Sequence, residues 1–273
     1  MLLVNSISPI SKIIPTNGSN PALVLCEDLT EYYCKYSRYT PANKLLIEFI
    51  SSSFLKVWNV PTPDFAFVEI AAEHVPAEIL SNRISRNDFL IPTFGSQHLE
   101  HSHEIDESVI LSWNNKRGQV NKIINKEDFL RIGLFDLWMA NEDRNHNNYN
   151  LMISAKEEGS VIYAIDHEKC FNSGILDNVH PIQILTEDES ILKTDLVPIL
   201  FNNEFHLEDA IRGILEGYSN SVNECKHQLP GILQQIPERW NINTDEIATL
   251  LEKNIFAPEW MELTVQTFKE YLN

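Results

Sequence analysis

A polar loop between an apolar helix and a β-hairpin constrains the fold of this chain more than any other segment. Residues 129–139 are apolar nearly all round and predict a helix at the centre of the molecule. The polar run 141–150, Asn-Glu-Asp-Arg-Asn-His-Asn-Asn-Tyr-Asn, follows, and the apolar runs 149–154 and 161–165 then predict a hairpin. Because rigid elements hold the loop at both ends, we expect its side chains to face one cleft.

The loop and the hairpin supply the side chains that phosphoryl transfer requires. Asp143 stands five residues before Asn148, and Asp166 closes the second strand of the hairpin. This chemistry needs an acid that orients the attacking hydroxyl, and oxygen ligands that hold magnesium against the phosphates. Lys35, late in an N-terminal strand, is the candidate cation for the phosphates. Glu48, on the helix that follows, is its candidate partner.

The N-terminal part of the chain is predicted to be β-rich with one helix. A turn-forming cluster, 16–21, precedes the predicted strands 22–26 and 31–36. Apolar residues at helical spacing predict a buried helix over 42–58, and the prolines that follow end it. Alternating apolar residues predict another strand over 65–70.

The remaining elements are predicted with fewer signals. Residues 92–97 favour a short strand, and Asn125 with Asp128 is typical of a cap at the start of the central helix. After the hairpin the chain is predicted to be helical, with amphipathic segments near 207–217, 244–254 and 258–271.

Composition and charge restrict the classes of partner. A chain of 273 residues suffices for one large or two small domains. A net charge of −18, with only 21 Lys and Arg residues, disfavours nucleic acid and anionic membranes as direct partners. There is no basic leader and no long apolar run, and the four scattered cysteines predict reduced, buried thiols. We therefore expect a cytoplasmic protein whose nucleotide site gathers its few cations locally.

The loop sequence Asp143-Arg-Asn-His-Asn-Asn148 resembles the D-R-H-x-x-N catalytic loop of the HipA-like kinases, atypical Ser/Thr kinases of bacterial toxin–antitoxin systems. The order of elements over most of residues 13–170 is also similar to theirs, in particular to the compact branch that lacks an extra N-terminal subdomain. The chain departs from the family pattern at Asn145, where histidine is usual, and at Asp166-His-Glu168, which replaces an Asp-Phe-Gly-like triplet.

The resemblance implies a role for each candidate residue. Asp143 would be the catalytic base, and Asn148 and Asp166 would be the magnesium ligands. Lys35 would bind the α- and β-phosphates of ATP, paired with Glu48.

The resemblance also implies a nucleotide loop over the turn cluster 16–21. Backbone amides of Gly18, Ser19 and Asn20 would cradle phosphate there. In toxins of this class serines of this loop can be autophosphorylated, and Ser19 is the matching position.

Simpler interpretations of the same residues stay open. An Asx-rich loop is often only a turn held by side-chain to backbone hydrogen bonds. Lys35 equally fits a solvated lysine at a strand edge, and Glu48 a surface carboxylate. The three histidines of 98–103 stand beside acids and are more typical of an exposed loop than of a metal site. Arg144 is expected to brace the loop by pairing with an acid.

Together these features predict an α+β, bilobal protein-kinase-like fold, with a β-rich N-lobe over 1–98 and a mainly helical C-lobe over 99–273. The expected function is ATP- and Mg²⁺-dependent phosphotransfer to a Ser/Thr residue of a protein, with a cognate antitoxin as a further partner. Two alternatives stay open. The loop also resembles that of phosphoinositide kinases, which would indicate a lipid or small-molecule kinase. A pseudokinase that serves as a nucleotide- or protein-binding module is the other alternative.

Overall fold

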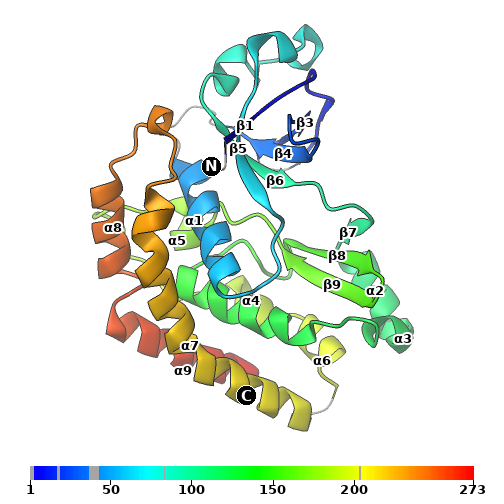
Figure 1. Cartoon of the computed structure of the whole chain (residues 1–273). Coiled ribbons are helices and arrows are strands. Elements are labelled where there is room, and N and C mark those ends of the chain that lie inside the picture. The colour runs from blue at the N-terminus through cyan, green and yellow to red at the C-terminus, as the bar shows by residue number, and fades with distance from the viewer. Residues whose placement is uncertain (1–2, 17–18, 37–42, 83, 203) are drawn as a thin grey trace.

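A computed structural model of the chain describes residues 3–16, 19–36, 43–82, 84–202 and 204–273, the last range without the side chain of Glu204. A β-rich part lies at the top of Figure 1, and a larger, mainly helical part lies below it. Among the described residues, no helix combines the length and the apolar character that crossing a bilayer would require.

The β-rich part is built on one six-stranded sheet with the order β1-β5-β6-β4-β3-β2. Its strands are β1 (Leu3–Asn5), β2 (Lys12–Ile13), β3 (Ala22–Leu25), β4 (Glu31–Lys35), β5 (Phe65–Glu69) and β6 (Thr93–Gln97). β1 runs parallel to β5, and the other neighbouring strands are antiparallel. A bridge between Ser6 and Cys26 joins the ends of β1 and β3, so the sheet curls around its own small core.

The interior of the curled sheet leaves no room for a side chain at Gly95. A Cβ atom at this position would lie 2.8 Å from Val68 Cγ2, on the neighbouring strand β5. Three short 3₁₀ turns then cover residues between β5 and β6: η1 (Ala72–His74), η2 (Ala77–Ile79) and η3 (Arg86–Phe89).

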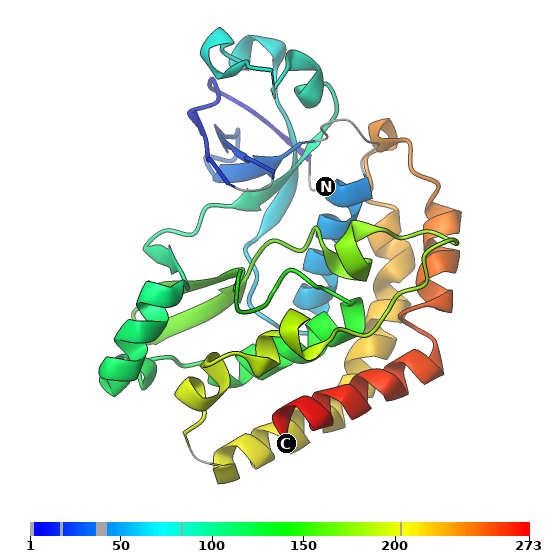
Figure 2. The same cartoon turned by 180° about the vertical axis from the view of Figure 1, so that it is seen from behind.

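The larger part combines a small sheet with helices, as Figure 2 shows from behind. Its sheet has the order β7-β8-β9, formed by β7 (Ser102–Glu104), β8 (Leu151–Lys156) and β9 (Gly159–Ala164). The helices are α2 (Glu107–Asn115), α3 (Arg117–Val120), α4 (Lys126–Met139), α5 (Cys170–Gly174), α6 (Leu196–Leu200), α7 (Glu204–Leu233), α8 (Thr244–Lys253) and α9 (Pro258–Leu272). Short turns η4 (Glu187–Glu189), η5 (Ile191–Lys193) and η6 (Glu238–Trp240) complete the described elements.

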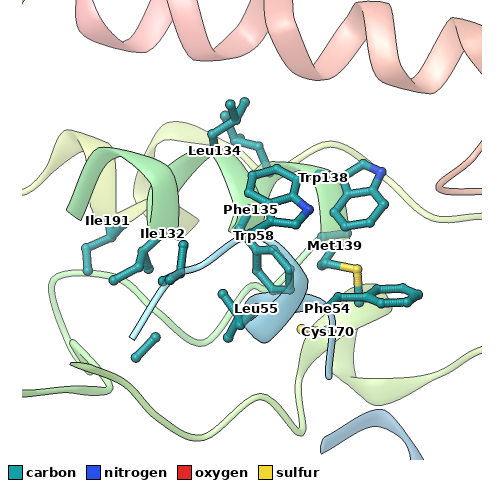
Figure 3. Close-up of a cluster of buried hydrophobic side chains, with 14 of the residues drawn as sticks. Phe54, Leu55, Trp58, Ile132, Leu134, Phe135, Trp138, Met139, Cys170 and Ile191 are labelled. Carbon is teal, nitrogen blue, oxygen red and sulfur yellow. The ribbon is translucent and has the colours of Figure 1, made fainter. Parts of the chain in front are cut away.

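The main core lies between α1 (Asn43–Val57), α4 and α7. Figure 3 shows aromatic side chains of α4 meeting those at the end of α1. The rings of Trp58 and Trp138 stack with centroids 5.3 Å apart, and Phe135 meets Trp58 edge-on. Such aromatic pairs contribute beyond their buried area. α1 comes from the N-terminal part of the sequence, yet this packing fixes it to the helical part.

The structure confirms most of the predicted elements, including the N-terminal strands, the hairpin and the central helix. The helix predicted over 42–58 is confirmed from Asn43, since residue 42 lies outside the described residues. The cysteines are free and buried, as predicted. The chain leaves the first sheet after Gln97 and enters the second at Ser102. The division into lobes after residue 98 stays a prediction.

Two predictions about the helical part were wrong. Residues 175–186 form neither helix nor strand, although everything after the hairpin was predicted to be helical. Asn125 precedes α4 as predicted, but its side chain does not cap the helix. It donates to Asp128 Oδ2 at 3.0 Å and exchanges hydrogen bonds of 2.9 Å with the backbone of Ile162 on β9. Hydrogen bonds to Ile162, which is distant in the sequence, thus take the place of the predicted helix cap.

The close approach of η5 to α4 gives a test of the packing. In Gly133→Ala the new Cβ would lie 2.2 Å from Leu192 Cδ2, and Leu192 is buried. We expect the free energy of unfolding to fall by about 1–3 kcal/mol, the usual cost of overpacking. Gly213→Ala in α7 is the matched control, because nothing lies within 4 Å of that Cβ. It should stabilise the protein by up to about 1 kcal/mol. If urea unfolding showed that the free energy of unfolding changes in the same direction in both variants, the packing of η5 against α4 described here would be contradicted.

Candidate active site

The loop 141–150 is fixed at both ends by residues with left-handed backbone. Ala140, at φ 49°, ends α4, and Asn150, at φ 46°, precedes β8. Inside the loop, Asn145 and Asn148 exchange two backbone hydrogen bonds of 3.0 and 3.2 Å. The side chain of Asn145 donates to the carbonyl of Glu142 at 2.9 Å. Asn145, one of the two departures from the family pattern, therefore shapes the loop.

A buried arginine ties the loop to its surroundings. Arg144 and Asp136 of α4 form an ion pair in which neither side chain is exposed. The same guanidinium donates to the carbonyls of Asn150 at 3.3 Å and Ile165 at 2.8 Å, and it lies 3.0 Å from His167 Nδ1. This confirms the prediction that Arg144 pairs with an acid. One side chain thereby connects α4, the loop and the segment after β9.

Asp143 lies within a small network of amides. Asn148 Nδ2 donates to Asp143 Oδ2 at 3.2 Å, and Asn150 Nδ2 donates to the same oxygen at 3.3 Å. Partial burial raises the pKa of Asp143, and the nearby carboxylate of Asp166 raises it further. The structure thus brings Asp143 and Asn148 together, with Asp166 close enough to act on them electrostatically.

Lys35 lies at the centre of a cluster of three acids from two segments, α1 and the segment after β9. Its ammonium group contacts the carboxylate of Glu48, on α1, and lies 2.6 Å from Asp166 Oδ1. Glu168 Oε2 is 3.4 Å from the same nitrogen. The side chains of Lys35 and Glu48 are 13% and 3% exposed, so this pair is shielded from solvent. Lys35, Glu48 and Asp166 therefore form one contiguous group.

The charges in this cluster shift one another's pKa values. Burial alone would lower the pKa of Lys35, but the carboxylates of Asp166, Glu48 and Glu168 outweigh it and raise that pKa. Burial raises the pKa of Glu48 to about 7. Burial alone would raise the pKa of Asp166, but the charge of Lys35 and the hydrogen bond from Lys35, with smaller contributions from His167 and Glu48, together lower it. Asp166 is thus held in its ionised form more firmly than Glu48 is.

The donor set of the cluster suits a divalent cation. Oxygen atoms of Glu48, Asp166 and Glu168 all lie within 4.8 Å of one another. Magnesium prefers hard oxygen ligands, which carboxylates supply and which the amide oxygen of Asn148 could add. The histidines of 98–103 contribute to no such group among the described residues, and His98 instead lies 3.3 Å from Glu31.

The predicted nucleotide loop is described only in part. Gly18 lies outside the described residues. Asn20 exchanges hydrogen bonds of 3.1 Å with Thr16, and its carbonyl accepts one of 3.0 Å from Tyr36, the residue after Lys35. Ser19 lies beside it in the same turn between β2 and β3. The roles of Gly18, Ser19 and Asn20 toward a nucleotide stay predictions.

Four residues of the site were not selected from the sequence: Asp136, Asn150, His167 and Glu168. The acid-x-acid spacing of Asp166 and Glu168 was the only local signal for Glu168. Asp136 had a signal of another kind, since an acid in an apolar helix needs a partner. Nothing in the sequence pointed to His167, whose pKa burial and Arg144 hold well below its ordinary value.

Comparison with known proteins supplies the family. The family model of HipA-like kinases matches residues 7–197. The chain belongs to the HipA-like kinase family. Membership confirms the family resemblance and identifies the chain as a kinase-type phosphotransferase.

One solved structure supports this fold. The structure is similar to the Helicobacter pylori proinflammatory kinase CtkA, with a TM-score of 0.57, 14% identity and coverage of 98% of both chains. It also matches HipA of Shewanella oneidensis MR-1, determined with HipB and its operator DNA, at a TM-score of 0.45 and 13% identity, over 94% of this chain and 62% of that one. No curated protein sequence gives a significant match. The protein-kinase-like fold is therefore confirmed, by the likeness to CtkA.

The buried arginine provides a test of how the site is held together. Arg144→Met would remove the ionic partner of the buried Asp136, so we expect the free energy of unfolding to fall by about 3–5 kcal/mol. Arg212→Met is the control, because Arg212 and its partner Asp209 are exposed and such pairs contribute less than about 1 kcal/mol. Chemical denaturation of both variants measures the difference. Equal losses of the free energy of unfolding would show that the buried Arg144–Asp136 pair stabilises the protein no more than the exposed Arg212–Asp209 pair does.

Proposed function

We propose that the chain is an ATP- and magnesium-dependent kinase that transfers a phosphoryl group to a serine or threonine hydroxyl of a protein. The observation that carries the proposal is the contact of Lys35 with Asp166, 131 residues away in the sequence, beside Glu48. A lysine held by an acid of the adjacent helix, next to an acid that can bind metal, is the arrangement that protein kinases require.

In this proposal each residue has a distinct task. Asp143 orients the acceptor hydroxyl and takes its proton, and the raised pKa of Asp143 increases its affinity for that proton. Lys35 binds phosphate oxygens and Glu48 holds its ammonium group in place. Asn148 and Asp166 would hold the magnesium ion, which supplies charge neutralisation on the phosphates when bound. Ser19 is the proposed site of autophosphorylation.

The proposal extends to the partners of the chain. Family membership supports a kinase but identifies no acceptor, so the protein acceptor is inferred from the resemblance to Ser/Thr kinases. A cognate antitoxin is proposed as a binding partner on the same basis. Reciprocal co-purification with the product of a neighbouring small helix-turn-helix gene would test this part independently of catalysis.

Removal of the proposed base tests the reaction itself. Asp143→Asn keeps the size of the side chain but cannot accept the proton, so phosphotransfer should fall by about 100- to 10,000-fold. Binding of Mg-ATP should change little. Intact mass and ADP release after incubation with Mg-ATP measure the reaction, and Asp177→Asn in an exposed turn is the control. Turnover of Asp143→Asn within tenfold of the wild type would refute the assignment.

Removal of the proposed metal ligand tests the cofactor. A ligand that binds only the folded state raises the melting temperature. In Asp166→Ala we expect magnesium to add nothing to the shift that ATP produces, whereas in the wild type magnesium should enlarge it. Thermal melts with ATP in EDTA and in excess magnesium measure the difference. The same magnesium-dependent increase in both proteins would mean that Asp166 holds no metal.

A further inference from the structure

The carboxylate of Glu168 lies between two lysines. Its Oε2 atom is 3.4 Å from Lys35 Nζ, and its Oε1 atom is 3.8 Å from Lys44 Nζ. The side chain of Glu168 is 12% exposed, whereas that of Lys44 is 51% exposed. One buried and one half-exposed ammonium group therefore converge on the two oxygens of a single anion.

Lys44 lies in the first described turn of α1. It is the second residue of α1, whose described first turn, from Asn43, contains no acidic residue. The first backbone N–H groups of a helix have no acceptor within the helix, and the helix dipole places partial positive charge at that end. In a chain with only 21 Lys and Arg residues, two of them, Lys35 and Lys44, thus lie within 4 Å of one carboxylate, that of Glu168.

The arrangement matches the requirements of a polyphosphate better than those of one carboxylate. A lysine ammonium is a compact charge with three donors, and phosphate oxygens on adjacent phosphorus atoms can each take one lysine. A triphosphate carries more charge and more oxygens than Glu168 does. We propose that Lys44 is a second phosphate-binding cation beside Lys35, and that Glu168 occupies their shared site until phosphates displace it. This inference rests on the proposed function, since it assigns residues to the same nucleotide site.

Displacement of this kind leaves both lysines paired before and after phosphate binds. A buried ammonium that loses its partner is strongly destabilising, because desolvation is no longer compensated. With Glu168 in place, both lysines are paired in the absence of nucleotide. When phosphates replace Glu168, both lysines are paired again, and Lys35 keeps its contact with Glu48 throughout. Glu168 is thus a positioning residue for the lysines.

The test measures binding of ATP without metal, so that any effect on magnesium is removed. Dissociation constants for ATP in EDTA are determined by calorimetry for the wild type, Lys44→Gln and Glu168→Gln. Lys44→Gln should weaken binding on the order of fivefold, the effect of one charge pair at a solvated site. Glu168→Gln should tighten binding by a similar factor, because the competing anion is removed. Adenosine, which lacks phosphates, should bind equally to all three proteins.

A matched control variant is available on the same helix. Lys56, in the last turn of α1, is 42% exposed and is paired with Asp64 at 2.6 Å. Lys56→Gln removes the same charge from α1, far from Glu168 along the helix, and should leave the affinity unchanged. Melting temperatures of all variants establish that each is folded.

The possible results separate the two proposals. If Lys44→Gln behaves like Lys56→Gln, Lys44 does not bind phosphate and the inference is wrong. If Glu168→Gln weakens the binding of metal-free ATP, Glu168 supports the lysines without occupying their site, which also overturns it. If the wild type binds neither metal-free ATP nor Mg-ATP, the proposed function fails. In that case, binding of inorganic tripolyphosphate in EDTA tests the inference about Lys44 separately. Binding that Lys44→Gln weakens supports the inference, and the absence of binding to the wild type refutes it.

Discussion

The site depends on one buried ion pair, between Arg144 and Asp136. Burying two charges is costly, and the cost is offset only when hydrogen bonds satisfy the remaining donors and acceptors. Here the guanidinium also donates to two backbone carbonyls, and Asn141 donates to Asp136 Oδ1 at 2.9 Å, whereas the buried Oδ2 atom of Asp136 has no hydrogen-bond partner among the described residues, so the cost is offset only in part. His167 fits this network because burial and Arg144 hold its pKa well below the ordinary value, so that its neutral ring can accept at Nδ1. The position of Asp166, one residue before His167, follows from that arrangement.

A second constraint is the shortage of positive charge, with 21 Lys and Arg residues against 39 Asp and Glu residues. Lys35 lies at the junction of the two parts of the molecule. It belongs to β4 of the curled sheet, whereas Glu48 belongs to α1, whose packing fixes it to the helical part. Asp166 follows the hairpin of that same helical part. One lysine thereby joins the sheet to two segments of the other part, and the candidate site forms where these segments meet.

Periodicity and spacing in the sequence were sufficient for much of this description. The helix over 42–58 and the hairpin were predictable because their apolar residues repeat with a clear period over a sufficient length. The order of Asp143, Asn148 and Asp166 was informative because a loop between two rigid elements leaves its side chains few directions. Residues 175–186 were wrongly predicted to be helical because they stand between helical segments, although their apolar residues do not repeat at helical spacing. The hydrogen bonds of this stretch are local or tertiary, such as the two between Asn172 and Gln183.

The residues that sequence analysis missed fall into two groups: those whose partner is close in the sequence and those whose partners are distant. Asp136 was accessible in principle: an acid within an apolar helix must be paired, and Arg144, already expected to pair with an acid, is eight residues away. Glu168 was not accessible in the same way. Its position depends on two lysines that lie far from it in the sequence, and on the direction in which α1 points. A local sequence pattern can show that a buried charge needs a partner, but only the folded structure shows that one carboxylate, that of Glu168, pairs with two lysines.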